Sequence, residues 1–185
     1  MYLHGVRQGV SKSFADRADS ACFWEAWVGA VLGRAGLYIL HHPFVADGGD
    51  YHALSWDLDV NSCNMFGGCG EGCYKSDGEI PVECKSLSLF FTRAEDYPNE
   101  PLFVCSQNSW MNKWTGKDRT QRDFLFISRQ TGAIVWLPVG TPVTLGHDAF
   151  DSSRGNTYKV VVTEKKYLKE LGDFVEYVKK TCYWT

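Results

Sequence analysis

The chain has 185 residues and a net charge of −3, with 44% hydrophobic and 22% charged residues, values that are ordinary for a folded protein with a core. The slightly acidic charge argues against a strong nonspecific nucleic-acid binder. No apolar run of 18 residues occurs, and residues 1–14 lack the apolar core of a signal peptide, so we expect no membrane span and a cytoplasmic location.

Apolar periodicity and turn residues predict the elements in chain order. A helix is expected over about 20–35, and it carries Glu25 in its first turns. Strands are expected at about 53–60 and 80–87, separated by a Cys- and Gly-rich loop insertion at 61–80. Buried-type strands are expected at 102–105 and 124–128, and a hairpin turn at 130–132 leads into a further strand at 133–137. Residues 140–158 are expected to be mostly loop, before a short strand at 158–163 and a helix over about 164–181. This order predicts a single α/β domain over 1–185, built around a mixed sheet flanked by helices.

Charged side chains share one face in each of the first two predicted strands. Asp57 and Asp59 alternate with apolar residues, as do Glu83 and Lys85. Two adjacent strands of this kind would bring two or three carboxylates and one ammonium together, which is costly without a metal or a function. We therefore expect Asp57, Asp59 and Glu83 to bind Mg²⁺ (or Mn²⁺), which prefers oxygen ligands, with Lys85 orienting or deprotonating a water. Glu25 could reach the same cleft from the helix.

This ordered set resembles the PD-(D/E)XK nuclease superfamily, which has a restriction-endonuclease-like fold. The residues that carry the resemblance are Glu25, Trp56-Asp57-Leu58-Asp59-Val60 and Val82-Glu83-Cys84-Lys85-Ser86, and the likeness covers about 20–137. It implies an αβββαβ-type core and a Mg²⁺-dependent nuclease acting on DNA. By this likeness Asp57 or Asp59 and Glu83 would be metal ligands, Lys85 the catalytic lysine and Glu25 an auxiliary acid. The compact size fits a phage or mobile-element nuclease. A second copy of the same chain is a candidate partner, in a homodimer.

An alternative explains the same charges as an ion pair between strands on the surface. A second Glu-x-Lys occurs at Glu164–Lys166, at the predicted start of the last helix, so the motif alone has little specificity. The corresponding alternative function is a non-catalytic nucleic-acid- or protein-binding module, stabilised by a metal on the Cys loop.

Three cysteines fall in the Gly-rich loop: Cys63, Cys69 and Cys73. Thiolates near tight turns suit Zn²⁺ or an iron–sulfur cluster, and we favour Zn²⁺. A fourth ligand is not evident, and His52, Cys84 and Cys105 are candidates. Free thiols in a loop are the alternative.

Basic and aromatic residues are interleaved in the polar segment 107–122. Such a mixture can follow a phosphate backbone while aromatic rings stack on bases, so we expect a nucleic-acid-binding segment here. A solvated helix with its tryptophans turned toward the core is the alternative. The residues expected to bind nucleic acid are Lys113, Trp114, Lys117, Arg119 and Arg122.

Overall fold

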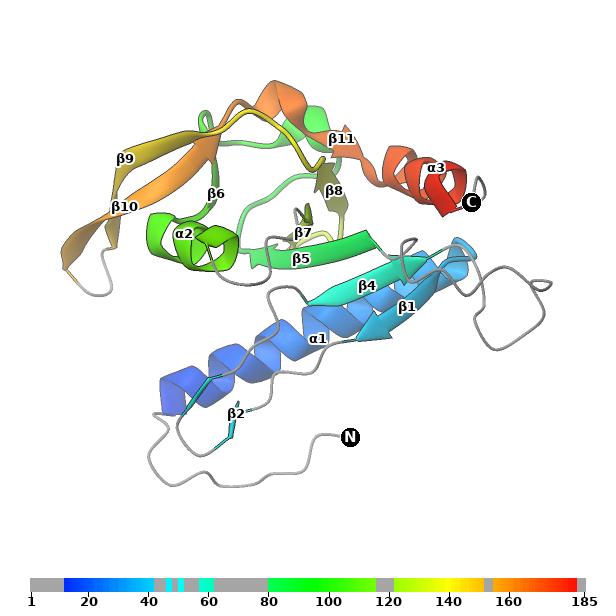
Figure 1. Cartoon of the computed structure of the whole chain (residues 1–185), viewed down its shortest axis with the longest axis horizontal. Coiled ribbons are helices and arrows are strands. Elements are labelled where there is room, and N and C mark those ends of the chain that lie inside the picture. The colour runs from blue at the N-terminus through cyan, green and yellow to red at the C-terminus, as the bar shows by residue number, and fades with distance from the viewer. Residues whose placement is uncertain are drawn as a thin grey trace.

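The computed structural model describes residues 12–41, 46–47, 50–51, 57–61, 80–115, 122–151 and 155–182. Three α-helices and eleven strands are present in this part of the chain (Figure 1). The helices are α1 (Lys12–Arg34), α2 (Gln107–Thr115) and α3 (Leu171–Cys182). The strands are β1 (Tyr38–His41), β2 (Ala46–Asp47), β3 (Asp50–Tyr51), β4 (Leu58–Asn61), β5 (Ile80–Leu87), β6 (Leu102–Ser106), β7 (Asp123–Ser128), β8 (Ile134–Leu137), β9 (Thr144–Asp151), β10 (Asn156–Thr163) and β11 (Lys169–Glu170).

The largest sheet is mixed and has the strand order β1-β4-β5-β7-β8-β11. The first three strands in this order are antiparallel neighbours, whereas β5 and β7 run parallel with Val82 opposite Asp123. The chain leaves β5, passes through β6 and α2, and returns as β7, which is the crossover that a parallel pair requires. The prediction of an α/β protein with a mixed sheet is confirmed.

A second, three-stranded sheet has the order β6-β10-β9 and is antiparallel throughout. Its strands β9 and β10 form a long hairpin that extends past α2 (Figure 1). The prediction of mostly loop over 140–158 is therefore wrong. Most side chains of β9 that the structure describes are exposed, so this strand lacks the apolar alternation by which a half-buried strand is recognised.

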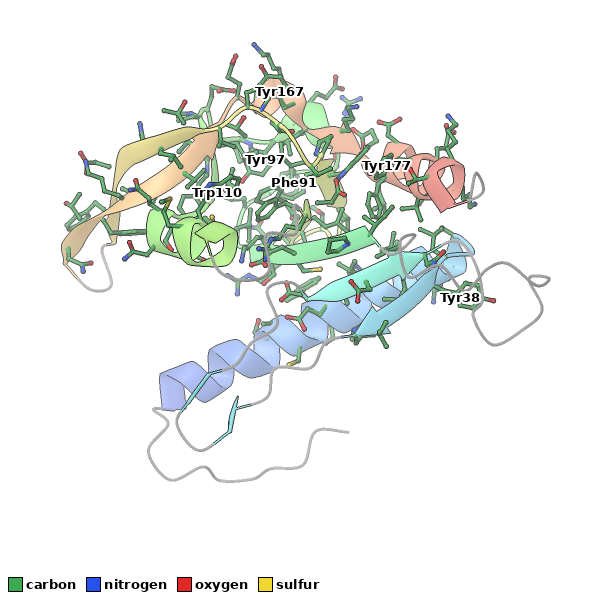
Figure 2. All side chains as sticks on the ribbon, viewed as in Figure 1. Tyr38, Phe91, Tyr97, Trp110, Tyr167 and Tyr177 are labelled. Atoms are coloured by element: carbon green, nitrogen blue, oxygen red, sulfur yellow. The ribbon has the colours of Figure 1, made fainter. Side chains whose placement is uncertain are left out.

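The large sheet separates two hydrophobic cores. On one face, Val28 and Leu32 of α1 and Phe174 of α3 pack against alternate residues of the strands, such as Val82 and Leu125. On the other face, a second core joins β6, β7, β8 and β10, and it includes the aromatic residues Phe91 and Tyr97, with Trp110 of α2 packed against it (Figure 2). Because side chains alternate along β5, a residue there contacts one core or the other.

Two contacts fix the position of α1 on the first face. Gly29 approaches β1 so closely that an added Cβ would lie 2.6 Å from Nε2 of His41. The indole Nε1 of Trp27 donates a hydrogen bond of 3.1 Å to the carbonyl oxygen of Gly132, whose φ of 74° suits glycine in the turn between β7 and β8.

None of the helices in the described ranges has both the length and the apolar character needed to cross a membrane.

Candidate functional site

Asp57 lies immediately before β4, next to Glu83 on β5. Leu58 pairs with Val82 in the antiparallel register, so the residue before Leu58 is set beside the residue after Val82. The Asp57 backbone N–H donates to the Val82 carbonyl at 2.9 Å, and the backbone N–H of Cys84 donates to Oδ2 of Asp57 at 2.6 Å. The Asp57 carboxylate is therefore held at the level of Glu83.

Glu83 lies between two cations. Nζ of Lys85 donates to Oε1 of Glu83, and Nη1 of Arg122 donates to Oε2 at 3.2 Å. Glu83 and Arg122 are each only 3% exposed, whereas the Lys85 side chain is 30% exposed. Two cationic donors, one to each oxygen, fix the orientation of the Glu83 carboxylate. For Glu83 to bind a metal ion through Oε1, the Lys85 ammonium must move away from that oxygen.

The surroundings of Lys85 keep its side chain protonated. Burial lowers the pKa of Lys85, but the charge of Glu83, its hydrogen bond and the charge of Asp57 more than offset this, so the pKa lies above its usual 10.5. Lys85 is therefore an ammonium at neutral pH. It can orient a water or neutralise a phosphate, but it is poorly suited to removing a proton.

Glu25, on α1, is influenced by the same group of charges. Burial, followed by the carboxylates of Asp57 and Glu83, raises the pKa of Glu25 from 4.5 to about 7, and the Lys85 ammonium opposes this shift. Glu25 therefore lies within electrostatic range of these charges, although α1 covers the face of β5 opposite to Glu83 and Lys85. The structure thus brings together Asp57, Glu83 and Lys85, three of the four residues that the sequence predicts to be catalytic, and places Glu25 within electrostatic range of them.

Alternation along β5 explains why its charges face this way. Cys84 packs against the first core, on the face that α1 covers, so Glu83 and Lys85 point to the opposite face. Burial, followed by the nearby carboxylates, raises the pKa of the Cys84 thiol well above 9.0. A thiol in this state is neutral at physiological pH and acts as a core residue.

Asp59 is farther along β4 than the other carboxylates. It is 8% exposed and lies between Leu40 of β1 and Pro81 of β5 in the register. Two residues of extended strand correspond to about 6.8 Å, so Asp59 shares a face with Asp57 but not its immediate surroundings. In the part of the chain that the structure describes, no three His, Cys, Asp or Glu side chains are arranged as a metal site.

Several other predicted residues fall outside the described part of the chain. Cys63, Cys69, Cys73, Lys117 and Arg119 are among them, so the metal loop and much of the nucleic-acid-binding segment stay predictions.

Lys113 and Trp114 lie on α2, but their side chains are not described. Cys84 and Cys105 are candidates for the fourth ligand of a metal on the cysteine loop. They belong to hydrophobic cores on opposite faces of the large sheet. They cannot both contribute to one metal site.

Two charged residues at the start of β7 have roles that the sequence did not suggest. Arg122 lies inside the protein against Glu83, rather than on a surface open to a phosphate backbone. Asp123 is 1% exposed and accepts hydrogen bonds from Nε1 of Trp136 at 2.7 Å and from the backbone N–H of Val139 at 2.9 Å. The sequence feature that could have indicated their burial is their position directly before the predicted buried strand at 124–128.

Neither a scan against protein-family models nor a search of solved structures found a match to this chain.

Proposed function

We propose that this protein is a Mg²⁺-dependent nuclease that hydrolyses phosphodiester bonds in DNA. The observation that carries the proposal is that Asp57 and Glu83 lie side by side, with the Lys85 ammonium against Glu83, while Glu25 of α1 lies within electrostatic range of these charges. Buried carboxylates that repel one another reduce stability, so their presence in one place favours a function that uses them.

The order and direction of the elements support a restriction-endonuclease-like core as part of the proposal. Helix α1 is followed by the antiparallel neighbours β1, β4 and β5, and after α2 the chain forms β7 parallel to β5. This succession corresponds to the αβββαβ arrangement that the sequence resemblance implies. In this arrangement Glu83 lies on β5 and Asp57 lies directly before β4, the antiparallel neighbour of β5.

The donor set suits Mg²⁺, which in proteins is typically bound by one or two carboxylates with water and phosphate oxygens completing the shell. In the proposed enzyme Asp57 and Glu83 hold the ion. When bound, Mg²⁺ supplies charge neutralisation at the phosphate and makes a coordinated water more acidic. Asp59 is too far along the strand to share this role without movement, so Asp57 is the preferred aspartate.

The remaining side chains have distinct roles. Lys85, an ammonium with a partly exposed side chain, orients the attacking water and offsets charge on the phosphate once it leaves Oε1 of Glu83. Glu25, with its pKa near 7, can accept or return a proton at neutral pH. Arg122 acts as a positioning residue, because its hydrogen bond fixes the Glu83 carboxylate from the buried side.

The test is incubation of the full chain with supercoiled and linear DNA in the presence of Mg²⁺ or Mn²⁺, with EDTA as the negative control. The proposed nuclease cleaves at least one of these DNA forms and stops in EDTA. A folded protein that leaves both forms intact with either metal would contradict the proposal. The same assay on single-stranded RNA establishes whether DNA is the preferred substrate.

One observation favours a second candidate, a non-catalytic nucleic-acid- or protein-binding module. Both carboxylate oxygens of Glu83 already have cationic partners, which is the arrangement of a structural ion network. A binding module would retard labelled DNA in a gel, or capture a protein partner, without cleaving DNA under any metal condition. A nuclease would cleave in Mg²⁺ and would retain its binding in EDTA or Ca²⁺.

A further inference from the structure

A pocket of about 310 Å³ is lined in part by Arg122. Its walls come from β6, α2, β7 and β8 and from the turn 138–143 that follows β8. The walls are mostly apolar and include Val104, Trp110 and Phe124, and the last two rings stack with their centroids 6.3 Å apart. A small concave site with apolar walls and few polar groups is typical of a ligand pocket.

Arg122 contributes the charge in this pocket, and part of its hydrogen-bonding capacity is unused. Its side chain is 1% exposed, and Nη1 donates to Glu83. Within the described residues, Nε and Nη2 have no hydrogen-bond partner. A buried donor without a partner costs about 1–3 kcal/mol, so a ligand that supplies the missing acceptor gains affinity from this site.

The two unused nitrogens define the shape of the acceptor. Nε–H and Nη2–H lie along one edge of the planar guanidinium and point in the same direction, so they form a fork that matches two oxygens of one carboxylate or phosphate. No acidic side chain is among the described residues that line the pocket. An anion in the pocket therefore meets no competing carboxylate on its walls, and it reaches Nε and Nη2 of Arg122 once the side chains that shield these atoms shift.

The turn that forms part of the pocket wall is held in place by Asp123. Its carboxylate accepts the backbone N–H of Val139, within the turn that lines the pocket, and the indole N–H of Trp136 on β8. Thr141 closes the same turn by donating from Oγ1 to the Pro138 carbonyl at 2.6 Å. The pocket is thus formed before a ligand arrives, which reduces the entropy cost of binding.

We propose that this pocket binds a small organic oxyanion, with a carboxylate or phosphate head on the Nε–Nη2 edge of Arg122 and an apolar or aromatic body against Trp110 and Phe124. The site is separate from the proposed nuclease chemistry and needs neither Mg²⁺ nor DNA. It shares one group with that chemistry, because the same guanidinium contacts Glu83 through Nη1. An occupant of the pocket therefore draws on a charge that also stabilises the Glu83 carboxylate.

The test uses benzoate, phenyl phosphate and benzamide as probes, with the full chain in EDTA buffer. Isothermal calorimetry measures affinity, and the ¹⁵N–¹H signal of the Arg122 Nε–H reports contact with the guanidinium. Benzoate or phenyl phosphate should bind saturably and shift that signal, and comparison of the two separates carboxylate from phosphate preference. Benzamide has a similar shape without the charge and should bind at least about tenfold more weakly, since a charge-assisted bond is lost.

A variant that fills the pocket keeps the proposal falsifiable without altering Arg122. Val143→Trp enlarges a lining residue, whereas Leu145→Trp makes the same kind of change at an exposed position outside the pocket. Val143→Trp should abolish probe binding while Leu145→Trp retains it. The proposal is overturned if neither anion binds the wild-type chain, if benzamide binds as well as benzoate, or if the Val143→Trp variant binds undiminished.

Discussion

Nη1 of Arg122 lies 3.2 Å from Oε2 of Glu83, and both side chains are almost fully shielded from solvent. The pair connects β5 to the residue that precedes β7, two strands that run in parallel. Glu83 contacts the partly exposed Lys85 through Oε1 and the buried Arg122 through Oε2, so the Arg122 pair is the buried part of the candidate site.

Breaking this pair should destabilise the protein strongly. Arg122→Met leaves the Glu83 carboxylate buried with Lys85 as its remaining cation, and we expect the free energy of unfolding to fall by about 3–5 kcal/mol. In a cycle with Glu83→Gln, the double variant should lose less than the sum of the single losses, by on the order of 1–3 kcal/mol. Urea unfolding of the four proteins measures both quantities.

The matched control is Arg93→Met, which removes an arginine that is 60% exposed and paired with Glu95 and Asp96 at the surface. It should cost no more than about 1 kcal/mol. Equal losses from Arg122→Met and Arg93→Met, or full additivity in the cycle, would contradict the buried pairing.

Glu25 should make stability depend on pH. Its pKa is raised from 4.5 to about 7, chiefly by burial, so the folded state holds this proton more tightly than the unfolded state does. Between these values the folded state binds more protons, and the free energy of unfolding should decrease as the pH rises through this window. Removing the carboxyl with Glu25→Gln should flatten the decrease.

Unfolding of wild type and Glu25→Gln in EDTA buffers from about pH 5 to about pH 8 measures this slope. Glu176→Gln changes a glutamate that is 72% exposed on α3, and its slope should match that of the wild type. Parallel curves for wild type and Glu25→Gln would show that Glu25 does not titrate in this range.

Asp123 is expected to act as a structural acceptor for the turn after β8. Asp123→Ala leaves the indole N–H of Trp136 and the backbone N–H of Val139 without this acceptor, and should cost about 2–4 kcal/mol. Asp123→Asn keeps one oxygen and should cost less. Asp148→Ala, at a position 63% exposed in an ion pair with Lys159, should stay within about 1 kcal/mol of wild type. A small effect of Asp123→Ala on chemical denaturation would refute this role.

The sequence predicted β5, β6, β7 and β8 well because each has a local apolar pattern. The alternating segment 80–87 and the apolar runs at 102–105, 124–128 and 133–137 correspond within about two residues to these strands, and β7 and β8 are buried on both faces. The last helix was predicted to start at about 164, but it begins at Leu171. The residues before it form a short 3₁₀ turn, Lys165–Tyr167, and then β11, which pairs with β8. Such pairing is decided by tertiary contacts rather than by local periodicity.

The candidate site could be predicted only in part for a similar reason. Alternation within each strand placed Glu83 and Lys85 on one face, because strand geometry is local. The burial of Arg122 depends on the parallel register between β5 and β7, which sets residues about forty positions apart side by side. A basic residue in a polar segment therefore suggested a surface contact, although it lies inside the protein.

The most direct test of the central claim compares two Glu-x-Lys motifs in the same chain. Glu83 and Lys85 belong to the proposed site, whereas Glu164 and Lys166 form an exposed pair with Nζ 2.7 Å from Oε2. Mg²⁺-dependent DNA cleavage is measured for wild type, Glu83→Gln, Lys85→Met, Glu164→Gln and Lys166→Met, with circular dichroism to establish that each is folded. We predict that the first two variants lose activity by about 100-fold or more while the other two cleave like wild type. Undiminished cleavage by folded Glu83→Gln and Lys85→Met would contradict the account.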